Sequence, residues 1–199
     1  VSVAQLEGFY YKPRIDKQML REHKEGLIAF TACLHGEIPM LIKANRLKDA
    51  GQAALEFHEL FGEGNFFLEV QNNGIDEQEI VNQALLEMSK RLSIPLVATN
   101  DCHYLDREDV RAHDVLLCIQ TGKIIHETER LKFKTDQLYF KSKSEMYDEF
   151  KSYPGALDHT ADIAKRCNLE FDFNTYHFPK FETSPGRTID ELFEQEARD

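Results

Sequence analysis

Three short apolar runs divide the first hundred residues of the chain, and each is typical of a buried β-strand. They cover residues 26–34, 65–71 and 94–100, and each is nearly continuous in apolar side chains. Continuous apolar residues, as opposed to alternating ones, indicate strands that are covered on both faces, as in parallel sheets. Pro95 stands near the start of the third run, where its missing N–H does least harm to a sheet.

Helical patterns separate these runs. Residues 46–61 and 76–92 repeat apolar side chains at helical spacing. The first pattern stops at Gly62, and the second begins with acidic residues that suit a helix N-terminus. Alternating strands and helices are the rhythm of a parallel sheet or barrel, so the pattern predicts an α/β fold.

The rhythm changes after residue 105. The pattern now predicts a helix over 107–120 capped by Asp106, a strand over 137–142, a helix capped by Ser144, and a helix from Pro154 to about Cys167. Residues 173–188 contain two prolines, a glycine and several turn formers, which is typical of a connector. The residues after this connector begin one further helix.

Composition narrows the class of protein. A chain with 42% hydrophobic and 30% charged residues is an ordinary globular protein with a sizeable core. Its four cysteines form no CxxC pair, which fits a reducing compartment better than a disulfide scaffold. No apolar run approaches the roughly 20 residues that cross a bilayer, and the N-terminus lacks both a secretory pattern and an initiator methionine. We therefore expect a cytoplasmic protein without a membrane partner, cut from a longer chain.

The net charge of −11 argues against this chain wrapping nucleic acid by itself, because phosphate binding is driven by Lys and Arg. The distribution is uneven, however. Six basic residues stand between positions 123 and 143 against three acidic ones: Lys123, Arg130, Lys132, Lys134, Lys141 and Lys143. Such a patch indicates either a solvated loop face or a phosphate contact, and we rank the solvated face first.

Candidate chemistry stands where the third apolar run ends. Asp101 and His103 follow it directly, and ligands of parallel α/β folds collect at the carboxyl ends of strands. Residues i and i+2 of an extended segment project to the same side. A carboxylate with an imidazole suits Zn²⁺, Mn²⁺ or Fe. The alternative is that Asp101 caps the turn and His103 hydrogen-bonds locally.

Cys33 is the second candidate, because it ends the first apolar run in "FTACLHGEIP", before Gly36 and a turn that precedes Pro39. A thiolate there would complete a site with the Asp-x-His pair, although a lone cysteine on a strand is more often a small buried hydrophobe. Cys102 is predicted to point away into the core. Three further donors are each more in keeping with a structural role: His35, His113 and Glu69.

Several segments together resemble the bacterial replicative DNA polymerase III α subunits: "LEGFYYKPRID", "ACLHGEIP", "LVATNDCHY", "AHDVLLCIQTGK" and "IAKRCNLEF" with "YHFPKF". They occur in the family's order over essentially the whole chain. The resemblance implies that residues 1–155 are the C-terminal portion of a PHP (polymerase and histidinol phosphatase) domain, which is part of a distorted (β/α)7 barrel. Residues 156–199 would then be a mostly helical junction and the start of the polymerase core.

The resemblance also implies ligands. PHP barrels of this family bind metals through an early HxH pair, an Asp–His pair, a Glu, a Cys or His on a middle strand, and a late DxH. Cys33 matches the middle-strand ligand, and Asp101 and His103 match the late DxH, so these three are the implied ligands of Zn, Mn or Fe. The chain departs from the family at Ala32, where Gly is common, and at Asn73, where His is common.

The function implied is that of a DNA-directed DNA polymerase whose PHP domain, when its ligands are retained, is associated with 3′–5′ exonuclease proofreading. No HxH precedes residue 33, and the family's Mg-binding polymerase aspartates correspond to positions beyond Asp199. We therefore expect no catalytic residue in this chain and a catalytically silent piece. The implied partners are primer-template DNA, deoxynucleotides, a proofreading subunit, a sliding clamp and a clamp loader. A stand-alone PHP phosphoesterase and a non-catalytic PHP scaffold that docks a proofreading subunit are the alternatives.

Overall fold

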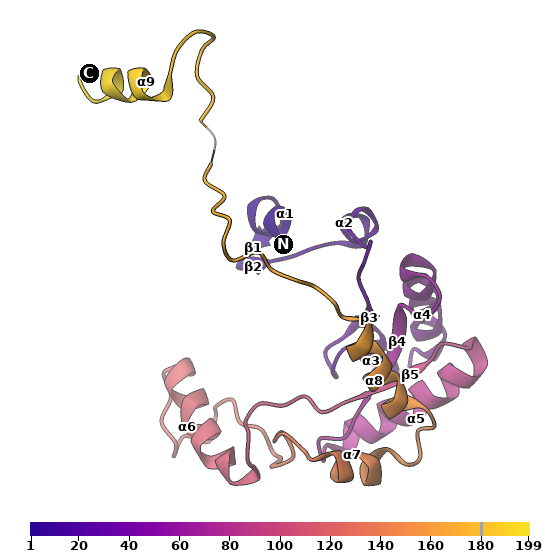
Figure 1. Ribbon diagram of the computed structural model, residues 1–199. Helices are drawn as coiled ribbons and strands as arrows, with labels where there is room; N and C mark the ends of the chain where they lie inside the picture. Colours follow the sequence, from indigo (N-terminus) through magenta and orange to yellow (C-terminus); the bar gives the residue numbers. More distant parts are fainter. Residues whose placement is uncertain (180) are drawn as a thin grey trace. The chain divides into compact units, whose positions relative to one another are not determined.

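The computed structural model describes residues 1–179 and 181–199 and divides into two compact units, Val1–Arg166 and Cys167–Asp199 (Figure 1). Lys180, which belongs to the predicted connector, lies outside the described residues. The predicted boundary between residues 155 and 156 separates a PHP domain from a polymerase core. The division into compact units does not test such a boundary, so it stays a prediction.

A three-stranded parallel sheet forms the centre of the first unit. Its strands are β3 (Ala29–Phe30), β4 (Phe66–Gln71) and β5 (Leu96–Thr99), in that spatial order. Both neighbouring pairs are parallel, and every residue of β4 is buried. This confirms the parallel α/β sheet that the continuous apolar runs predict. The seven-stranded barrel stays a prediction, since the described residues form three parallel strands and no closed barrel.

The first strand is much shorter than the apolar run that predicts it. Gly26 has a φ of 74° and Ala32 a φ of 61°, both in the left-handed region. Each therefore takes the backbone out of the extended conformation on one side of β3. Cys33 consequently lies in a loop and not on the strand itself.

Two long helices connect the strands, as the helical periodicity predicts: α4 (Leu47–Phe61) and α5 (Asp76–Leu92). Both pack against β4, and a hydrophobic core fills the contact. The core draws small residues from α4, larger ones from α5 and the inner residues of the sheet: Ala50, Ala54, Val81, Leu85, Met88, Leu68, Val70 and Ala98. This packing fixes the positions at which β4 and β5 end.

The turn expected before Pro39 is present: the N–H of Gly36 donates to the Cys33 carbonyl at 2.9 Å. Residues Glu37–Lys43 form helix α3, with Gly36 as its N-cap. Proline is tolerated there because the first turn of a helix has no intrahelical acceptors for its N–H groups. Further short elements that the sequence pattern did not predict precede it: α1 (Ser2–Leu6), β1 (Phe9–Tyr10), β2 (Lys12–Pro13) and α2 (Lys17–Glu22).

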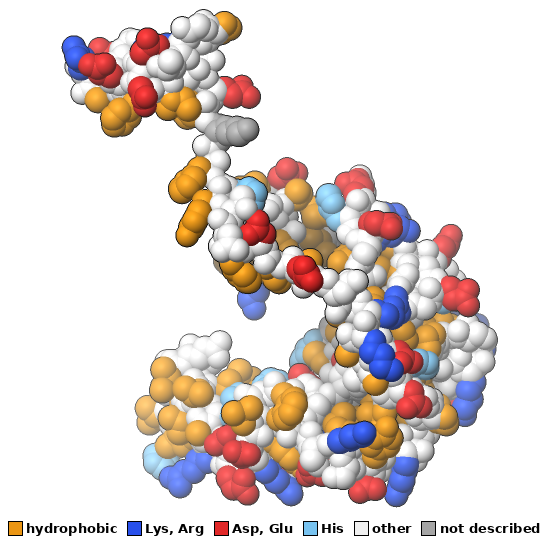
Figure 2. Space-filling view, in the orientation of Figure 1, with side chains coloured by type: hydrophobic (Ala, Val, Ile, Leu, Met, Phe, Trp, Pro, Cys, Tyr) orange, Lys and Arg blue, Asp and Glu red, His pale blue; other side chains and the backbone are white. Residues whose placement is uncertain are grey.

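The helix expected over 107–120 is present as a single 3₁₀ turn, η1 (Arg107–Asp109), followed by α6 (Val110–Thr121). Asp106 is the N-cap of η1, and Gly122 ends α6 in the left-handed region. Figure 2 shows hydrophobic side chains on the surface in this part of the molecule. Leu116 and Ile119 of α6, and Ile124 shortly after it, are each more than half exposed. Packing within the described residues leaves this face of α6 uncovered.

The strand expected over 137–142 is wrong. The segment makes one isolated bridge, between Tyr139 and Tyr104. Its partner is the irregular loop after β5: the N–H of Phe140 donates to the Tyr104 carbonyl, and the N–H of His103 donates to the Leu138 carbonyl. An irregular partner offers no continuous ladder, so β-prone residues here do not form a strand.

The cap of the next helix is Ser142, not Ser144. Helix α7 covers Lys143–Phe150, and the Ser142 hydroxyl accepts the N–H of Glu145 at 3.3 Å. The Glu145 carboxylate accepts the N–H of Ser142 at 2.8 Å, which completes a capping box. Ser144 stands three residues before Tyr147, which has no carboxylate to complete such a box.

Helix α8 (Ala156–Arg166) packs against β5 and so closes the first unit (Figure 1). Two of its side chains bind carbonyls of that strand: His159 Nδ1 lies 2.7 Å from the Leu96 oxygen, and Thr160 donates to Ala98 at 2.7 Å. The second unit contains helix α9 (Ile189–Glu196), the helix that the last residues begin. Within the described part of the chain, no helix combines the length and apolarity needed to cross a membrane.

Candidate functional site

A pocket of about 200 Å³ lies where β4 and β5 end, and all three predicted ligands line it. Cys33 reaches it from the loop after β3, and Asp101 and His103 reach it from the loop after β5. The remaining lining comes from the same loop after β3, from the end of β4 and the residues after it, from α5 and from the segment before α7: Leu34, His35, Gln71, Asn73, Ile75, Gln78, Phe133 and Leu138. The residues therefore gather as expected, and their role as metal ligands stays a prediction.

The Asp-x-His pair forms one direct contact. His103 Nε2 lies 3.4 Å from Asp101 Oδ1, and each side chain is about one-third exposed (29% and 34%). The amide of Asn73 reaches the other carboxylate oxygen, Oδ2, at 3.4 Å. The geometry fits both a ligand pair and a local hydrogen bond.

Cys33 has a neighbour that sequence reasoning set aside. Its Sγ lies 3.9 Å from Nδ1 of His35, and the thiol is half-buried and free. Cys33 and His35 have the same i, i+2 spacing as Asp101 and His103, which was the signal that could have identified His35. The pocket thus receives two donor pairs from two different loops.

Both donor loops turn through strained backbone. Asp101 has a φ of 51° and Ala32 a φ of 61°, a region that side chains with a Cβ seldom occupy. Such strain tends to concentrate at functional sites. Gly36 is needed in the same loop as Ala32, because a Cβ there would lie 2.1 Å from the Thr31 carbonyl oxygen.

The donor chemistry suits a divalent metal, but the described side chains do not form a finished site. In residues 1–179 and 181–199, no three His, Cys, Asp or Glu side chains gather closely enough to hold an ion. Two buried amide oxygens of the lining, Gln71 Oε1 and Asn73 Oδ1, have no hydrogen-bond partner in the same described part. Thiol, imidazole and carboxylate on one pocket, with unpartnered oxygens beside them, fit a cation.

The structure also shows the surroundings of Glu69 and Cys102, which lie near the pocket. Glu69 is buried in the sheet, where Thr99 and Gln71 donate to its Oε1, which fits a structural role. The expectation that Cys102 belongs to the core is wrong, since its side chain is exposed beside the Asn100 amide, 3.2 Å away. The left-handed turn at Asp101 breaks the alternation of an extended strand and so redirects Cys102.

Comparison with known proteins finds similarity to one domain family and to one kind of polymerase subunit. Residues 1–73 match the PHP domain model. DNA polymerase III subunit alpha of Treponema pallidum is 47% identical over 168 residues, which are 84% of this chain and 14% of that protein. The subunit of Thermus aquaticus is 43% identical over 193 residues, 94% of this chain and 16% of that protein.

The chain is homologous to a segment of DNA polymerase III subunit alpha. It spans 14–16% of the length of these two relatives. The PHP match includes Cys33 and ends at Asn73, so Asp101 and His103 fall in the stretch covered by the similarity to the polymerase subunits.

In this homologue of the polymerase subunit, a buried lysine fixes the loops around the pocket. The side chain of Lys141 is fully buried, and its Nζ donates to the Gln137 carbonyl at 2.7 Å and to Asn100 Oδ1 at 3.2 Å. It also reaches the Asn72 carbonyl at 3.4 Å. Burial lowers the pKa of Lys141, while burial raises the pKa of Glu149, whose carboxylate lies 3.8 Å away.

The basic patch over 123–143 is therefore not a uniform solvated face. Lys141 is buried, and the Arg130 side chain is 4% exposed where it forms a bidentate pair with Asp114 at 2.6 and 2.8 Å. Lys123 pairs with Glu127 at 3.0 Å on the surface. Contacts with other residues thus occupy part of the patch, and Lys132 and Lys134 are among the cations that remain.

An aromatic cluster adjoins the pocket. The ring of His103 packs edge-on against His113 and Phe133, with centroids 5.4 and 5.0 Å apart. Burial, followed by the neighbouring charge of His103, lowers the pKa of His113. These rings hold the His103 side chain at the edge of the pocket.

Proposed function

We propose that the chain is part of the PHP domain of a replicative DNA-directed DNA polymerase and that its strand-end pocket binds a divalent metal, Zn, Mn or Fe. The observation that carries the proposal is the meeting of Cys33, Asp101 and His103 on one pocket from two different strand-end loops. These residue types are ligands of borderline metals. The implied domain limits, 1–155 and 156–199, form part of the proposal.

The chemistry proposed for this pocket is 3′–5′ exonuclease hydrolysis of a phosphodiester. A bound divalent metal supplies charge neutralisation at phosphate oxygens and a more acidic water. The chain's own part is to hold the donors. Asn73 orients the Asp101 carboxylate, the aromatic cluster orients the His103 ring, and Lys141 fixes the loop through Asn100.

For the whole protein, we propose primer extension by nucleotidyl transfer, with Mg²⁺ held by carboxylates outside this segment. Its substrates are then primer-template DNA and deoxynucleotides. Its partners are a proofreading subunit, a sliding clamp and a clamp loader, in the cytoplasm. Support comes from 37–47% identity to proteins named DNA polymerase III subunit alpha, over 84–98% of this chain.

A non-catalytic PHP scaffold that docks a separate proofreading subunit is the second candidate. One observation favours it: Asp101 and His103 contact each other directly, and the described residues form no three-donor cluster. Such a scaffold would bind no stoichiometric metal.

The deciding experiment replaces Asp101 and His103 with Ala in the full-length protein. We expect loss of bound metal by elemental analysis and loss of 3′–5′ exonuclease activity, while primer extension is unchanged because its carboxylates lie elsewhere. The matched control, Asp148→Ala with His126→Ala, removes the same residue types from exposed positions. Unchanged metal content in the Asp101/His103 variant would refute the ligand assignment, and a metal-free wild-type protein would support the scaffold.

A further inference from the structure

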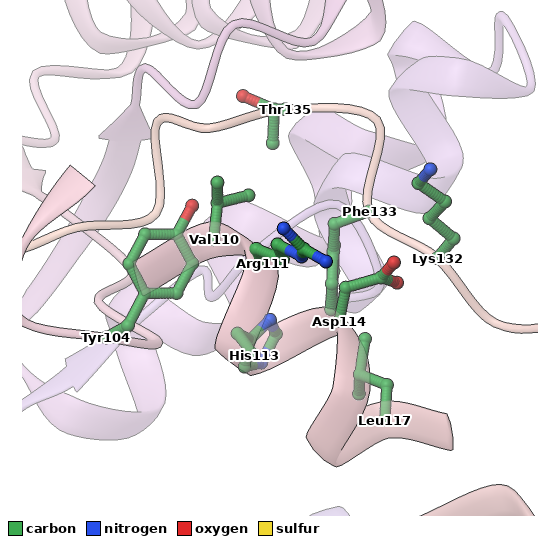
Figure 3. Close-up of a pocket in the computed structure, with 9 residues that line it drawn as sticks. All are labelled: Tyr104, Val110, Arg111, His113, Asp114, Leu117, Lys132, Phe133 and Thr135. Carbon is green, nitrogen blue, oxygen red and sulfur yellow. The ribbon is translucent and has the colours of Figure 1, made fainter. Parts of the chain in front are cut away.

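A second pocket of about 250 Å³ lies between α6 and the loop at residues 132–135 (Figure 3). Its lining comes from α6, from that loop and from the residue after His103: Val110, Arg111, His113, Asp114, Leu117, Lys132, Phe133, Thr135 and Tyr104. Phe133 also lines the strand-end pocket, so the two cavities share a wall. The function proposed above assigns no role to this second pocket.

Aromatic rings form one wall of the second pocket. The centroids of Tyr104 and His113 lie 5.4 Å apart, and those of His113 and Phe133 lie 5.7 Å apart. Clustered rings beside an open volume are the platform on which nucleobases stack, whatever their sequence.

The charge of the second pocket is positive. Arg111 and Lys132 line it, and within the described part of the chain neither has an ion-pair or side-chain hydrogen-bond partner. The one acid in the lining, Asp114, is already neutralised by the bidentate contact with Arg130. Two cations remain for a ligand, and arginine with lysine beside aromatic rings favours phosphate together with a base.

One polar atom of this wall lacks a partner. The Tyr104 hydroxyl is buried and makes no hydrogen bond within the described residues. An unmade hydrogen bond of a buried hydroxyl is costly, and a ligand with polar atoms would supply the partner.

We propose that this pocket binds one nucleoside monophosphate unit, with its phosphate on Arg111 and Lys132 and its base against Phe133, His113 and Tyr104. The volume is below the roughly 300–1,000 Å³ of sites that enclose drug-sized ligands, so it admits one unit and not a strand. The unit is a free nucleotide or the end of a nucleic-acid strand. The role of this second pocket in presenting a strand end to the neighbouring metal pocket rests on the proposed function. The binding of the monophosphate unit does not depend on it.

The test uses the full-length protein with EDTA present and the monophosphate of 2-aminopurine deoxyriboside, whose fluorescence falls when it stacks on aromatic rings. We expect quenching that inorganic phosphate reverses, and at least tenfold weaker binding of the unphosphorylated deoxynucleoside. Arg111→Gln with Lys132→Gln should weaken binding of the monophosphate about tenfold or more, since each removes a charged hydrogen bond. The charge-matched control, Lys48→Gln with Lys151→Gln, removes two exposed cations elsewhere and should change binding less than twofold.

Tyr104→Phe keeps the ring and removes the hydroxyl, so it tests the same pocket in a variant that folds normally. We expect binding weakened several-fold, with the unfolding temperature unchanged or raised because the unpartnered buried hydroxyl is removed. Oligonucleotides with 2-aminopurine at the 3′ end or at an internal position separate the two sources. Stronger binding of the 3′-terminal probe than of the free monophosphate assigns the site to a strand end, and the reverse order assigns it to free nucleotide.

Two results would overturn the proposal: wild-type affinity in the Arg111/Lys132 variant, or equal binding of the deoxynucleoside and its monophosphate. Its failure is separable from failure of the metal assignment. Absent nucleotide binding with normal metal content sinks the nucleotide site alone. Normal nucleotide binding in a protein that holds no metal sinks the metal site alone.

Discussion

Replacing Lys141 with Met removes one charge from the inside of the first unit and shortens the unbranched side chain by one atom. The Nζ atom donates to the Gln137 carbonyl at 2.7 Å and to Asn100 Oδ1 at 3.2 Å, with the Glu149 carboxylate 3.8 Å away. These two acceptors, the Asn72 carbonyl at 3.4 Å and a half-buried carboxylate therefore lose their donor at once. Because Asn100 precedes Asp101, the effect should appear in the loop that carries the Asp-x-His pair.

The magnitude follows from these contacts. Each buried acceptor left without a partner costs about 1–3 kcal/mol. The Glu149 side chain is 24% exposed, so water screens part of its lost attraction to the lysine. We expect the free energy of local opening to fall by about 3 kcal/mol, which corresponds to roughly a hundredfold faster amide exchange. Adding Glu149→Gln should recover about 1 kcal/mol, because it removes the unpaired charge.

Hydrogen exchange of the full-length protein, read by mass spectrometry over peptides 96–105 and 137–142, is the assay, since it reports local stability in a large protein. Lys143→Met is the control, because it removes the same charge from an exposed residue. Exchange in Lys141→Met within threefold of wild type would refute the view that this lysine holds the loops together.

Three other predictions concern single residues. Hydrogen bonds from Ser142 and Tyr139 lower the pKa of Glu145 from 4.5 to about 2. The stabilisation of α7 by the Glu145 carboxylate is therefore complete above pH 4.5 and is lost as the pH falls towards 2. A carboxyl NMR titration, with Glu145→Gln as the reference for assignment, checks this pKa. Ala32→Gly should raise stability by about 0.5–1 kcal/mol in thermal unfolding, because glycine relieves the left-handed φ. Gly36→Ala should lower the free energy of unfolding by about 1–3 kcal/mol in the same assay, because the added Cβ clashes with the Thr31 carbonyl. Unchanged stability would show that the loop backbone moves to accommodate the Cβ.

The elements that the sequence predicted best are those with a clear apolar pattern of their own. Helices α4 and α5 and strands β4 and β5 lie where their apolar patterns place them, because their burial depends on a pattern that each segment carries itself. The segment 137–142 has strand-forming residues, yet its neighbour is an irregular loop, which no local pattern records. Helix α3 was not predicted, because it is short and has Pro39 in its first turn.

The candidate site was predictable as far as its residues follow recognisable apolar runs, and contacts between distant segments were not. Cys33, Asp101 and His103 follow apolar runs, and parallel strands bring their carboxyl ends to one edge. The burial of Lys141 was not predictable, since its acceptors come from residues 72, 100 and 137, far apart along the chain. The outward position of Cys102 depends on one left-handed residue, Asp101, and period-two alternation gives no sign of it.

Cobalt(II) substitution of the full-length protein tests the metal assignment most directly, because a thiolate ligand adds a charge-transfer band to the cobalt spectrum. With Cys33, Asp101 and His103 as ligands, the metal-depleted protein should take up Co²⁺ and show this band. Cys33→Ser should abolish the band while some cobalt remains bound through the other two residues. A wild-type protein that takes up no cobalt, or that binds it without a thiolate band, would contradict the account.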